Sequence, residues 1–322
     1  MNVDINENAL YRLDNDLLTR LLKDRSSGKN IIWATDNYSV RGYGYQFSDH
    51  ITIESITGYH GRIIKPRSEK SKKEQNSRIR DKAEVFTPSW ICNKQNNLID
   101  NAWFGIDYVF NTEFEKSWVA TSSPIAFPTP SGKTWQDYVC DVRLEITCGE
   151  APYLVSRYDT VSGTAIELSQ RIGLLDRKLR ITSENTLTET DWLKWAIKSY
   201  QSIYGYDWQG DNVLLARENL LFTFIDYYKA KFNKEPAIDT LKKIADILSW
   251  NIWQMDGLKF VIPESCKEIE NVQLSIFDLN GEKQPCPGCT KNSPYEHTGT
   301  YCMIKDWKIN KTMTFVSLLK KN

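Results

Sequence analysis

Cysteines and a histidine near the C-terminus are the first residues whose spacing suggests chemistry. Cys286, Cys289, His297 and Cys302 form the pattern C-x2-C-x7-H-x4-C. Two thiolates two residues apart can chelate Zn²⁺, and a histidine with a third cysteine would complete a tetrahedral structural site. Free thiols in a turn are the alternative. The total of seven cysteines is odd, which favours reduced thiols over disulfides.

Acidic residues at three predicted strand ends form a second candidate site. Glu145 stands shortly before Cys148-Gly149, Asp207 follows I-Y-G-Y, and Asp256 lies in N-I-W-Q-M-D-G-L. A glycine turn lets the backbone approach a ligand, and a carboxylate can accept from both hydroxyls of a ribose. A further aspartate can accept from the exocyclic amine of adenine. Together they favour a cofactor with an amino-acid tail, a ribose and an adenine, with helix capping and loop solvation as the alternative.

Strands alternating with helices must position these acidic residues. Such alternation predicts a mainly parallel sheet covered on both faces, with ligands at the carboxyl ends of the strands. We therefore expect an α/β fold. The predicted strands span 142–146, 202–206 and 249–254, and the predicted helices span 88–102, 186–200, 211–232 and 238–248.

Three regions follow from this pattern. Leucines at helical spacing predict an amphipathic helix over 7–24, ended by Ser26-Ser27-Gly28. Short β-branched segments over 30–35, 50–56 and 61–64 predict a small antiparallel β unit. The expected regions are an N-terminal α/β extension (1–80), a ligand-binding core (81–265) and a small Cys-rich C-terminal segment (266–322).

Composition and charge describe a soluble globular chain. Its 322 residues are 41% hydrophobic, and 41 basic residues balance 41 acidic ones. A local excess of positive charge occurs over 62–82, with nine basic and three acidic residues, typical of a solvated surface or of a segment that follows phosphates. No apolar run reaches the roughly 20 residues of a membrane span. Without a secretory signal, we expect a cytoplasmic location and no membrane partner.

Four segments together resemble a known family. A-E-V-F-T-P at 83–88, the C-G loop, the Asp207 segment and the Asp256 segment occur in the order found in adenine-N6 DNA methyltransferases of the γ order. W-A-T-D-N-Y and T-P-S-W-I-C-N resemble restriction–modification M subunits in particular. The resemblance covers about half of the chain and implies a Rossmann-like S-adenosylmethionine-dependent methyltransferase sheet, with DNA as substrate. The residues it implies are Phe86, Thr87, Pro88, Glu145, Cys148 and Gly149 around the methionine moiety, Asp207 on the ribose, Asp256 on the adenine, and Trp208 flanking the adenine ring.

Two features depart from the family pattern. Glu150-Ala151-Pro152 stands where the family usually has a second glycine, so we expect a stiffer cofactor loop. The catalytic D/N-P-P-Y/F/W motif, which holds the target amine and stacks on the flipped base, has one candidate here, Asn292-Ser293-Pro294-Tyr295. Because P-C-P-G-C-T-K precedes it instead of an apolar strand, an ordinary loop is the alternative to a catalytic role for Asn292, Pro294 and Tyr295.

These departures favour a split enzyme. The chain would be the cofactor-binding subunit, and a second polypeptide would bring the N-P-P-Y strand and a target-recognition domain. A complete methyltransferase that uses 292–295 is one alternative, and an inactive methyltransferase-fold module that binds DNA or a partner is the other. The split enzyme predicts an exposed apolar surface where the missing strands would dock. Candidates for this surface are Ile304, Trp307, Phe315, Val316 and Leu318.

Overall fold

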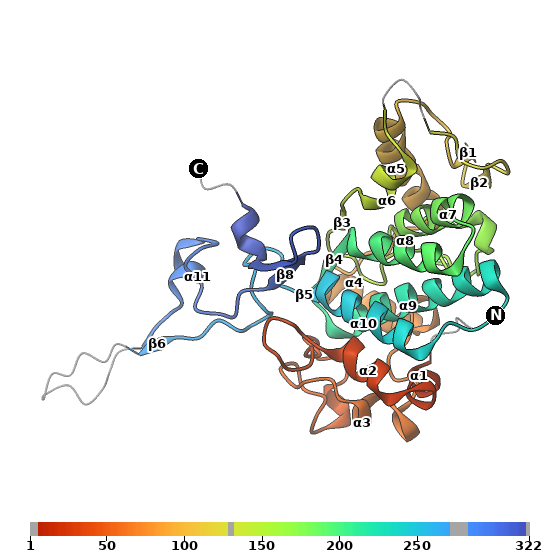
Figure 1. The fold of residues 1–322 in the computed structure, drawn as a ribbon. Helices are drawn as coiled ribbons and strands as arrows, with labels where there is room; N and C mark the ends of the chain where they lie inside the picture. The colour runs from red at the N-terminus through yellow and green to blue at the C-terminus, as the bar shows by residue number, and fades with distance from the viewer. Residues whose placement is uncertain (1–5, 128–131, 271–282, 320–322) are drawn as a thin grey trace, which may run out of the picture.

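Three parallel strands lie at the centre of the chain in the computed structural model, which describes residues 6–127, 132–270 and 283–319 (Figure 1). They are adjacent in the order β3-β4-β5, with Leu144 opposite Tyr204 and Tyr206 opposite Trp253. Because the strands are parallel, their carboxyl ends lie at the same edge of the sheet. The sheet consists of β3 (Arg143–Glu145), β4 (Ile203–Asp207) and β5 (Ile252–Gln254).

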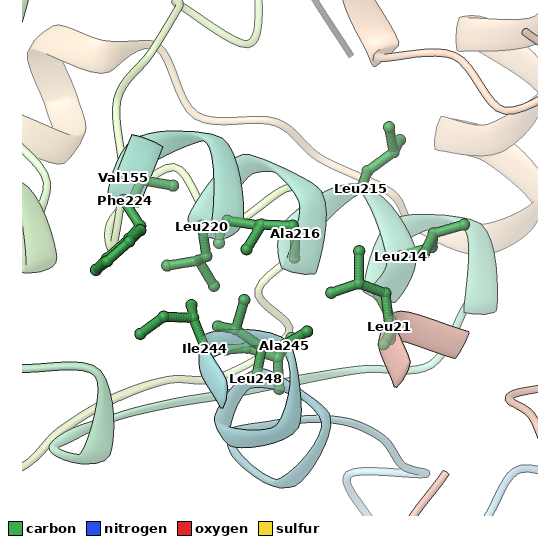
Figure 2. Close-up of a cluster of buried hydrophobic side chains, with 14 of the residues drawn as sticks. Leu21, Val155, Leu214, Leu215, Ala216, Leu220, Phe224, Ile244, Ala245 and Leu248 are labelled. Carbon is green, nitrogen blue, oxygen red and sulfur yellow. The ribbon is translucent and has the colours of Figure 1, made fainter. Parts of the chain in front are cut away.

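Helices cover one face of this sheet. The longest, α9, is buried along most of its length, including polar side chains such as Arg217 and Glu218. Leu214 and Leu220 of α9 pack against Leu248 of α10 and against Leu21 of the N-terminal region (Figure 2). Each such side chain contributes about 1.5–3 kcal/mol on burial. The covering helices are α7 (Leu174–Asn185), α8 (Glu189–Gln201), α9 (Gly210–Phe232) and α10 (Ile238–Asn251).

The opposite face of the sheet is covered only in part. Ile304 and Phe315 of the C-terminal segment pack on Tyr206 and Trp253, and the Phe315 and Trp253 ring centroids are 5.3 Å apart. This segment contains β8 (Met303–Asp306), β9 (Lys311–Thr314) and the 3-10 helix η6 (Phe315–Leu318). Beside β3 the same face is open, because Val142, Leu144 and Ile146 are 53%, 45% and 63% exposed. The sequence predicted a sheet covered on both faces. In the structure, one face is uncovered beside β3.

The N-terminal region differs from its prediction in two ways. The single expected helix is two, α1 (Glu7–Leu13) and α2 (Asn15–Leu22), because Asp14 between them is extended and accepts from the Asp16 backbone N–H at 2.8 Å. The expected β unit is reduced to isolated antiparallel bridges such as Ile32 with His50. Part of it is α3 (Ile53–Ile56), since Thr52 and Ser55 form a reciprocal capping box.

The chain between the N-terminal region and the sheet packs around a second core. Tyr138 of α6 and Phe104 of α5 are in this core, and the Tyr138 hydroxyl donates to Asp100 at 2.8 Å. Arg177 pairs with the same aspartate at 2.5 Å, both side chains being buried. The elements here are α5 (Ser89–Phe104), the hairpin of β1 (Asn111–Phe114) and β2 (Ser117–Ala120), and α6 (Trp135–Cys140). The helix before them, α4 (Lys72–Lys82), contacts α9 through Arg78 and Asp211 instead.

Small elements surround the cysteines near the C-terminus. They are β6 (Ile269–Glu270), β7 (Lys283–Gln284) and α11 (Pro287–Lys291). The chain is therefore a mixed α/β protein with small sheets and a Cys/His cluster near its C-terminus. None of the described helices has both the length and the apolar character that crossing a membrane requires.

Candidate functional site

A cavity of about 650 Å³ lies at the carboxyl ends of β3 and β4. This volume falls within the roughly 300–1,000 Å³ of typical ligand pockets. The loop after β3, the end of β4 and the segment before α5 form most of its lining. It brings together most of the residues predicted to bind a cofactor, namely Phe86, Thr87, Glu145, Cys148, Gly149, Asp207 and Trp208.

Asp207 ends β4 at the wall of this cavity. Its Oδ2 accepts the Gly149 backbone N–H at 2.9 Å, and its Oδ1 accepts the Gln209 N–H at 3.0 Å. Burial raises the pKa of Asp207 to about 6, although these two backbone hydrogen bonds work in the opposite direction. The carboxylate form therefore predominates above about pH 6 and can accept hydrogen bonds from a ligand.

The loop after β3 has an unusual backbone. Thr147, Gly149 and Ala151 have φ angles of 47°, 53° and 62°, in the left-handed region. For residues other than glycine this conformation costs about 1–2 kcal/mol, and such strain gathers at functional sites. Ala151, in the stretch where a second glycine was expected, thus adopts a conformation that favours glycine. The stiffness of this loop stays a prediction.

Two buried glutamates hold the same loop in place. Glu145 accepts the backbone N–H groups of Tyr153 and Leu154 at 3.3 and 3.1 Å, and burial raises its pKa to about 8. Glu150 accepts from the Arg67 backbone N–H and the Tyr158 hydroxyl, each at 2.6 Å. Burial also raises the pKa of Glu150. Glu150 is absent from the cavity lining, so its side chain does not block the space for a cofactor.

Phe86 forms another wall of the cavity. Its ring lies 3.5 Å from the position that a Cβ on Gly149 would take, and the Arg67 guanidinium lies 5.2 Å from its centroid. Thr87 follows it in the lining, whereas Pro88 immediately precedes α5 and is not in the lining. The F-T-P segment therefore reaches the cavity through its first two residues.

Asp256 lies outside the cavity lining, unlike the other two acidic strand ends. Its Oδ1 accepts the backbone N–H groups of Leu258 and Lys259 at 2.9 and 3.1 Å. It therefore stabilises its own turn after β5. Trp208 does line the cavity, and its indole N–H donates to the Ala34 carbonyl at 3.2 Å.

The catalytic candidates lie in the turn between Cys289 and His297. Asn292 ends α11 with a φ of 52°, and the Pro294 carbonyl accepts from the Tyr301 hydroxyl at 3.0 Å. Neither Asn292, Pro294 nor Tyr295 lines the cavity. The structure therefore does not bring this segment to Asp207.

A buried ionic network beside the cavity was not predicted from the sequence. Arg78 of α4 binds Asp211 at 2.8 Å and Glu84 at 2.7 Å, and Asn212 donates to Glu84 at 2.8 Å. Burial acts to raise the pKa of Asp211, but Arg78 and Lys70 hold it well below its ordinary value. The basic segment over 62–82 is thus partly internal. The sequence signal for this network was Asp211-Asn212 directly after the strand end, where α9 begins.

The Cys/His cluster contains Cys266, Cys286, Cys289 and His297, whose ligand atoms all lie within 4.8 Å of one another. The three sulfurs lie 3.6, 3.6 and 3.7 Å from His297 Nδ1. Tetrahedral Zn²⁺, with Zn–S near 2.3 Å and Zn–N near 2.0 Å, separates such atoms by about 3.5 Å. These residues could therefore hold a metal ion.

Cys302 is a correction to the predicted ligand set. It is fully buried, and its thiol donates to the Gln254 carbonyl at 3.3 Å, so it packs against β5. Cys266 takes its place in the cluster. Gly288 lets the turn close on the histidine, because a Cβ there would lie 2.6 Å from His297 Nδ1.

Comparisons of the chain with protein-family models, with curated proteins and with solved structures found no match. Function is therefore inferred from the geometry of the cavity and of the Cys/His cluster.

Proposed function

We propose that the chain is the cofactor-binding subunit of an adenine-N6 DNA methyltransferase of a restriction–modification system, acting in the cytoplasm. S-adenosylmethionine would occupy the cavity at the carboxyl ends of β3 and β4. The observation that supports this most is the hydrogen bond of 2.9 Å between Asp207 and Gly149 at the cavity wall. An acidic strand end beside a glycine loop suits a ligand with a ribose and an amino-acid tail.

Five of the cavity residues have direct roles in this proposal. Asp207 would accept from the ribose hydroxyls, and the backbone at Gly149 would approach the amino-acid tail. Phe86 and Thr87 would contact the methionine moiety, and Trp208 would flank the adenine ring. In a methyltransferase sheet, β3, β4 and β5 would be the first three strands, consistent with their parallel order.

Methyl transfer needs a group that this cavity lacks among the described residues. S-adenosylmethionine would supply the methyl group: adenine N6 would bond to the methyl carbon, the sulfur would leave as a neutral thioether, and the N6 proton would pass to solvent. A side-chain oxygen and a carbonyl must orient the amine for this in-line attack. Because 292–295 does not line the cavity, we assign this role to a second polypeptide that carries N-P-P-Y and a target-recognition domain.

Calorimetric titration with S-adenosylmethionine tests the cofactor assignment. Asp207→Ala should weaken binding by about 1–3 kcal/mol, because the ribose hydroxyls lose their acceptor. Asp256→Ala is the matched control and should leave the affinity unchanged. Equal affinities of wild-type and Asp207→Ala would remove Asp207 from the site.

Two further results would change the proposal itself. Absence of cofactor binding at millimolar concentration, with and without a partner chain, would favour an inactive module that binds DNA or a partner. Methylation of adenine-containing DNA by the purified chain alone would instead favour a complete methyltransferase.

For the Cys/His cluster we propose Zn²⁺ in a structural role. Three thiolates and one imidazole complete a tetrahedral shell without an open position, as structural zinc sites do. Metal analysis of the purified chain should find about one zinc per chain. Substitution with Co²⁺ should give the absorption bands of tetrahedral thiolate coordination, and octahedral bands would contradict this ligand set.

A further inference from the structure

The outer edge of β3 is open in the part of the chain that the structure describes. β3 pairs with β4 on one side and with no described strand on the other. Arg143 donates its backbone N–H to Ser202, on the β4 side, at 2.9 Å. Because successive residues of a strand point their backbone groups to opposite sides, the N–H and C=O of Leu144 face the open edge. Unpaired backbone groups of this kind recruit another strand.

An apolar groove of about 410 Å³ begins at this open edge. It runs from the end of α8 across the uncovered face of the sheet to the C-terminal segment. Four of the five residues that the sequence suggested for such a surface line it, and Val316 does not. Other apolar residues of the lining are Val142, Leu144, Trp195, Tyr204, Trp253 and Met313.

The same edge borders the cofactor cavity. Leu144 lines both the groove and the cavity, and Ile146 lines the cavity. Leu144 and Ile146 are 45% and 63% exposed, so the cavity is open on the side of β3. A strand laid along β3 would cover this side of the cavity and would place its own side chains over the groove.

Charge at the groove indicates what kind of chain fits. Its lining contains Lys198, Lys305 and Lys308 but only one acidic residue, Asp306. Lys305 lies 4.3 Å from the Trp307 ring centroid, and among the described residues Lys198 and Lys308 make no ion pair. A second copy of this chain, paired about a two-fold axis, would bring lysines to lysines. The groove therefore suits a different chain, whose apolar strand is flanked by acidic residues.

We infer that a separate polypeptide adds an apolar β-strand with acidic flanks along the open edge of β3, and that this strand closes the cofactor cavity. The inference rests on the proposed function only for the identity of the cofactor. Since the added strand covers the cavity, the partner and S-adenosylmethionine should each tighten the binding of the other by the same factor. We expect this factor to be several-fold.

Photo-crosslinking in the source cell tests the docking. p-Benzoyl-phenylalanine is placed at position 146 or 142 of the full chain, with position 187 as control, because Leu187 is 93% exposed and lies outside groove and cavity. Positions 146 and 142 should crosslink one extended apolar segment with acidic neighbours. Crosslinks to a second copy of this chain, or yields no higher than at position 187, would overturn the inference.

The second test uses a complex of the purified chain with the partner polypeptide that crosslinking identifies. In the complex, the amide of Leu144 should exchange with solvent at least tenfold more slowly than in the free chain. Leu144→Glu should abolish binding, and Lys198→Glu with Lys308→Glu should weaken it. Because the Leu144 side chain is half exposed, Leu144→Glu should still fold, which urea denaturation checks. Unchanged exchange at Leu144, or full binding by Leu144→Glu, would overturn the docking.

The two proposals fail in distinguishable ways. Protection of Leu144 in a complex that binds no S-adenosylmethionine would leave the docking intact and contradict the proposed cofactor. Cofactor binding by the chain with Leu144 unprotected would support the cofactor and overturn the docking. Equal cofactor affinity with and without a docked partner would overturn closure of the cavity.

Discussion

The Asp207 carboxylate accepts the Gly149 backbone N–H at 2.9 Å, although the two residues lie 58 positions apart in the chain. The bond joins the end of β4 to the loop after β3, and both flank the cavity. It also occupies one carboxylate oxygen with a protein donor. The geometry therefore holds the carboxylate in one orientation before any ligand arrives.

The first prediction concerns the pH dependence of cofactor binding. Burial raises the pKa of Asp207 to about 6, so the side chain holds a proton below that pH and is a carboxylate above it. Affinity for S-adenosylmethionine should therefore fall as the pH decreases from about 7.5 to about 5, because the protonated form accepts hydrogen bonds poorly. Asp207→Asn should bind more weakly and show a flat profile in calorimetry. An unchanged pH profile in Asp207→Asn would contradict the role of this carboxylate.

The second prediction concerns strain in the loop after β3. Thr147 is exposed with a φ of 47°, so Thr147→Gly should raise the free energy of unfolding by about 0.5–1 kcal/mol. Gly149→Ala should lower it by about 1 kcal/mol, since a Cβ would meet Phe86 only at ordinary contact distance and the backbone term dominates. Urea denaturation measures both.

An exposed threonine in an ordinary strand conformation serves as the control for these loop variants. Thr112 lies in β1, and Thr112→Gly should destabilise the protein rather than stabilise it. Stabilisation by both threonine substitutions would show that relief of left-handed strain is not the cause.

The third prediction compares two arginines of α4. Arg78 is buried between Glu84 and Asp211, so Arg78→Met removes the cation that pairs with Glu84 and leaves Asp211 with Lys70 alone at 3.6 Å, and it should cost about 3–5 kcal/mol of unfolding free energy. Arg80 pairs with Asp81 at the surface, and Arg80→Met should have little effect. Urea denaturation of the two variants makes the comparison. Similar losses would mean that helix propensity, rather than the buried network, sets the effect.

The fourth prediction separates the metal cluster from its neighbour. Cys266→Ser removes one of three thiolates, so bound zinc should decrease and the thiolate-to-metal absorption of the Co²⁺ form should weaken. Cys302→Ala removes a buried thiol outside the cluster and should leave the metal content unchanged. Loss of metal in Cys302→Ala, with retention in Cys266→Ser, would restore the ligand set that the sequence spacing suggested.

Much of the fold could be predicted because its signals are local. Apolar periodicity located α9 and α10, and strand patterns located β3, β4 and β5 to within a few residues. α7 was missed, because the side it buries includes charged residues. Among them, Lys178 donates to the Val139 carbonyl at 3.0 Å and to the Ser202 hydroxyl at 2.6 Å. Such burial depends on partners that a local pattern does not contain.

The sites show the same division. The spacing of Cys286, Cys289 and His297 was enough to predict that they lie close together, because only a short turn separates them. Cys266 lies 20 positions before Cys286, and only the folded chain shows that it reaches the cluster. In the other direction, Asp256 matched the acidic strand-end pattern, but its carboxylate caps its own turn instead of lining the cavity.

By itself the sequence determined the alternation of strands and helices, the acidic residue at the end of β4 and the close cysteine pair, because periodicity and turn residues act within a few positions. Only the tertiary structure decided that Asp207 meets Gly149, that Cys266 replaces Cys302 and that no described strand pairs with the outer edge of β3. Each of these depends on how segments distant in the chain pack against one another, which no local pattern specifies.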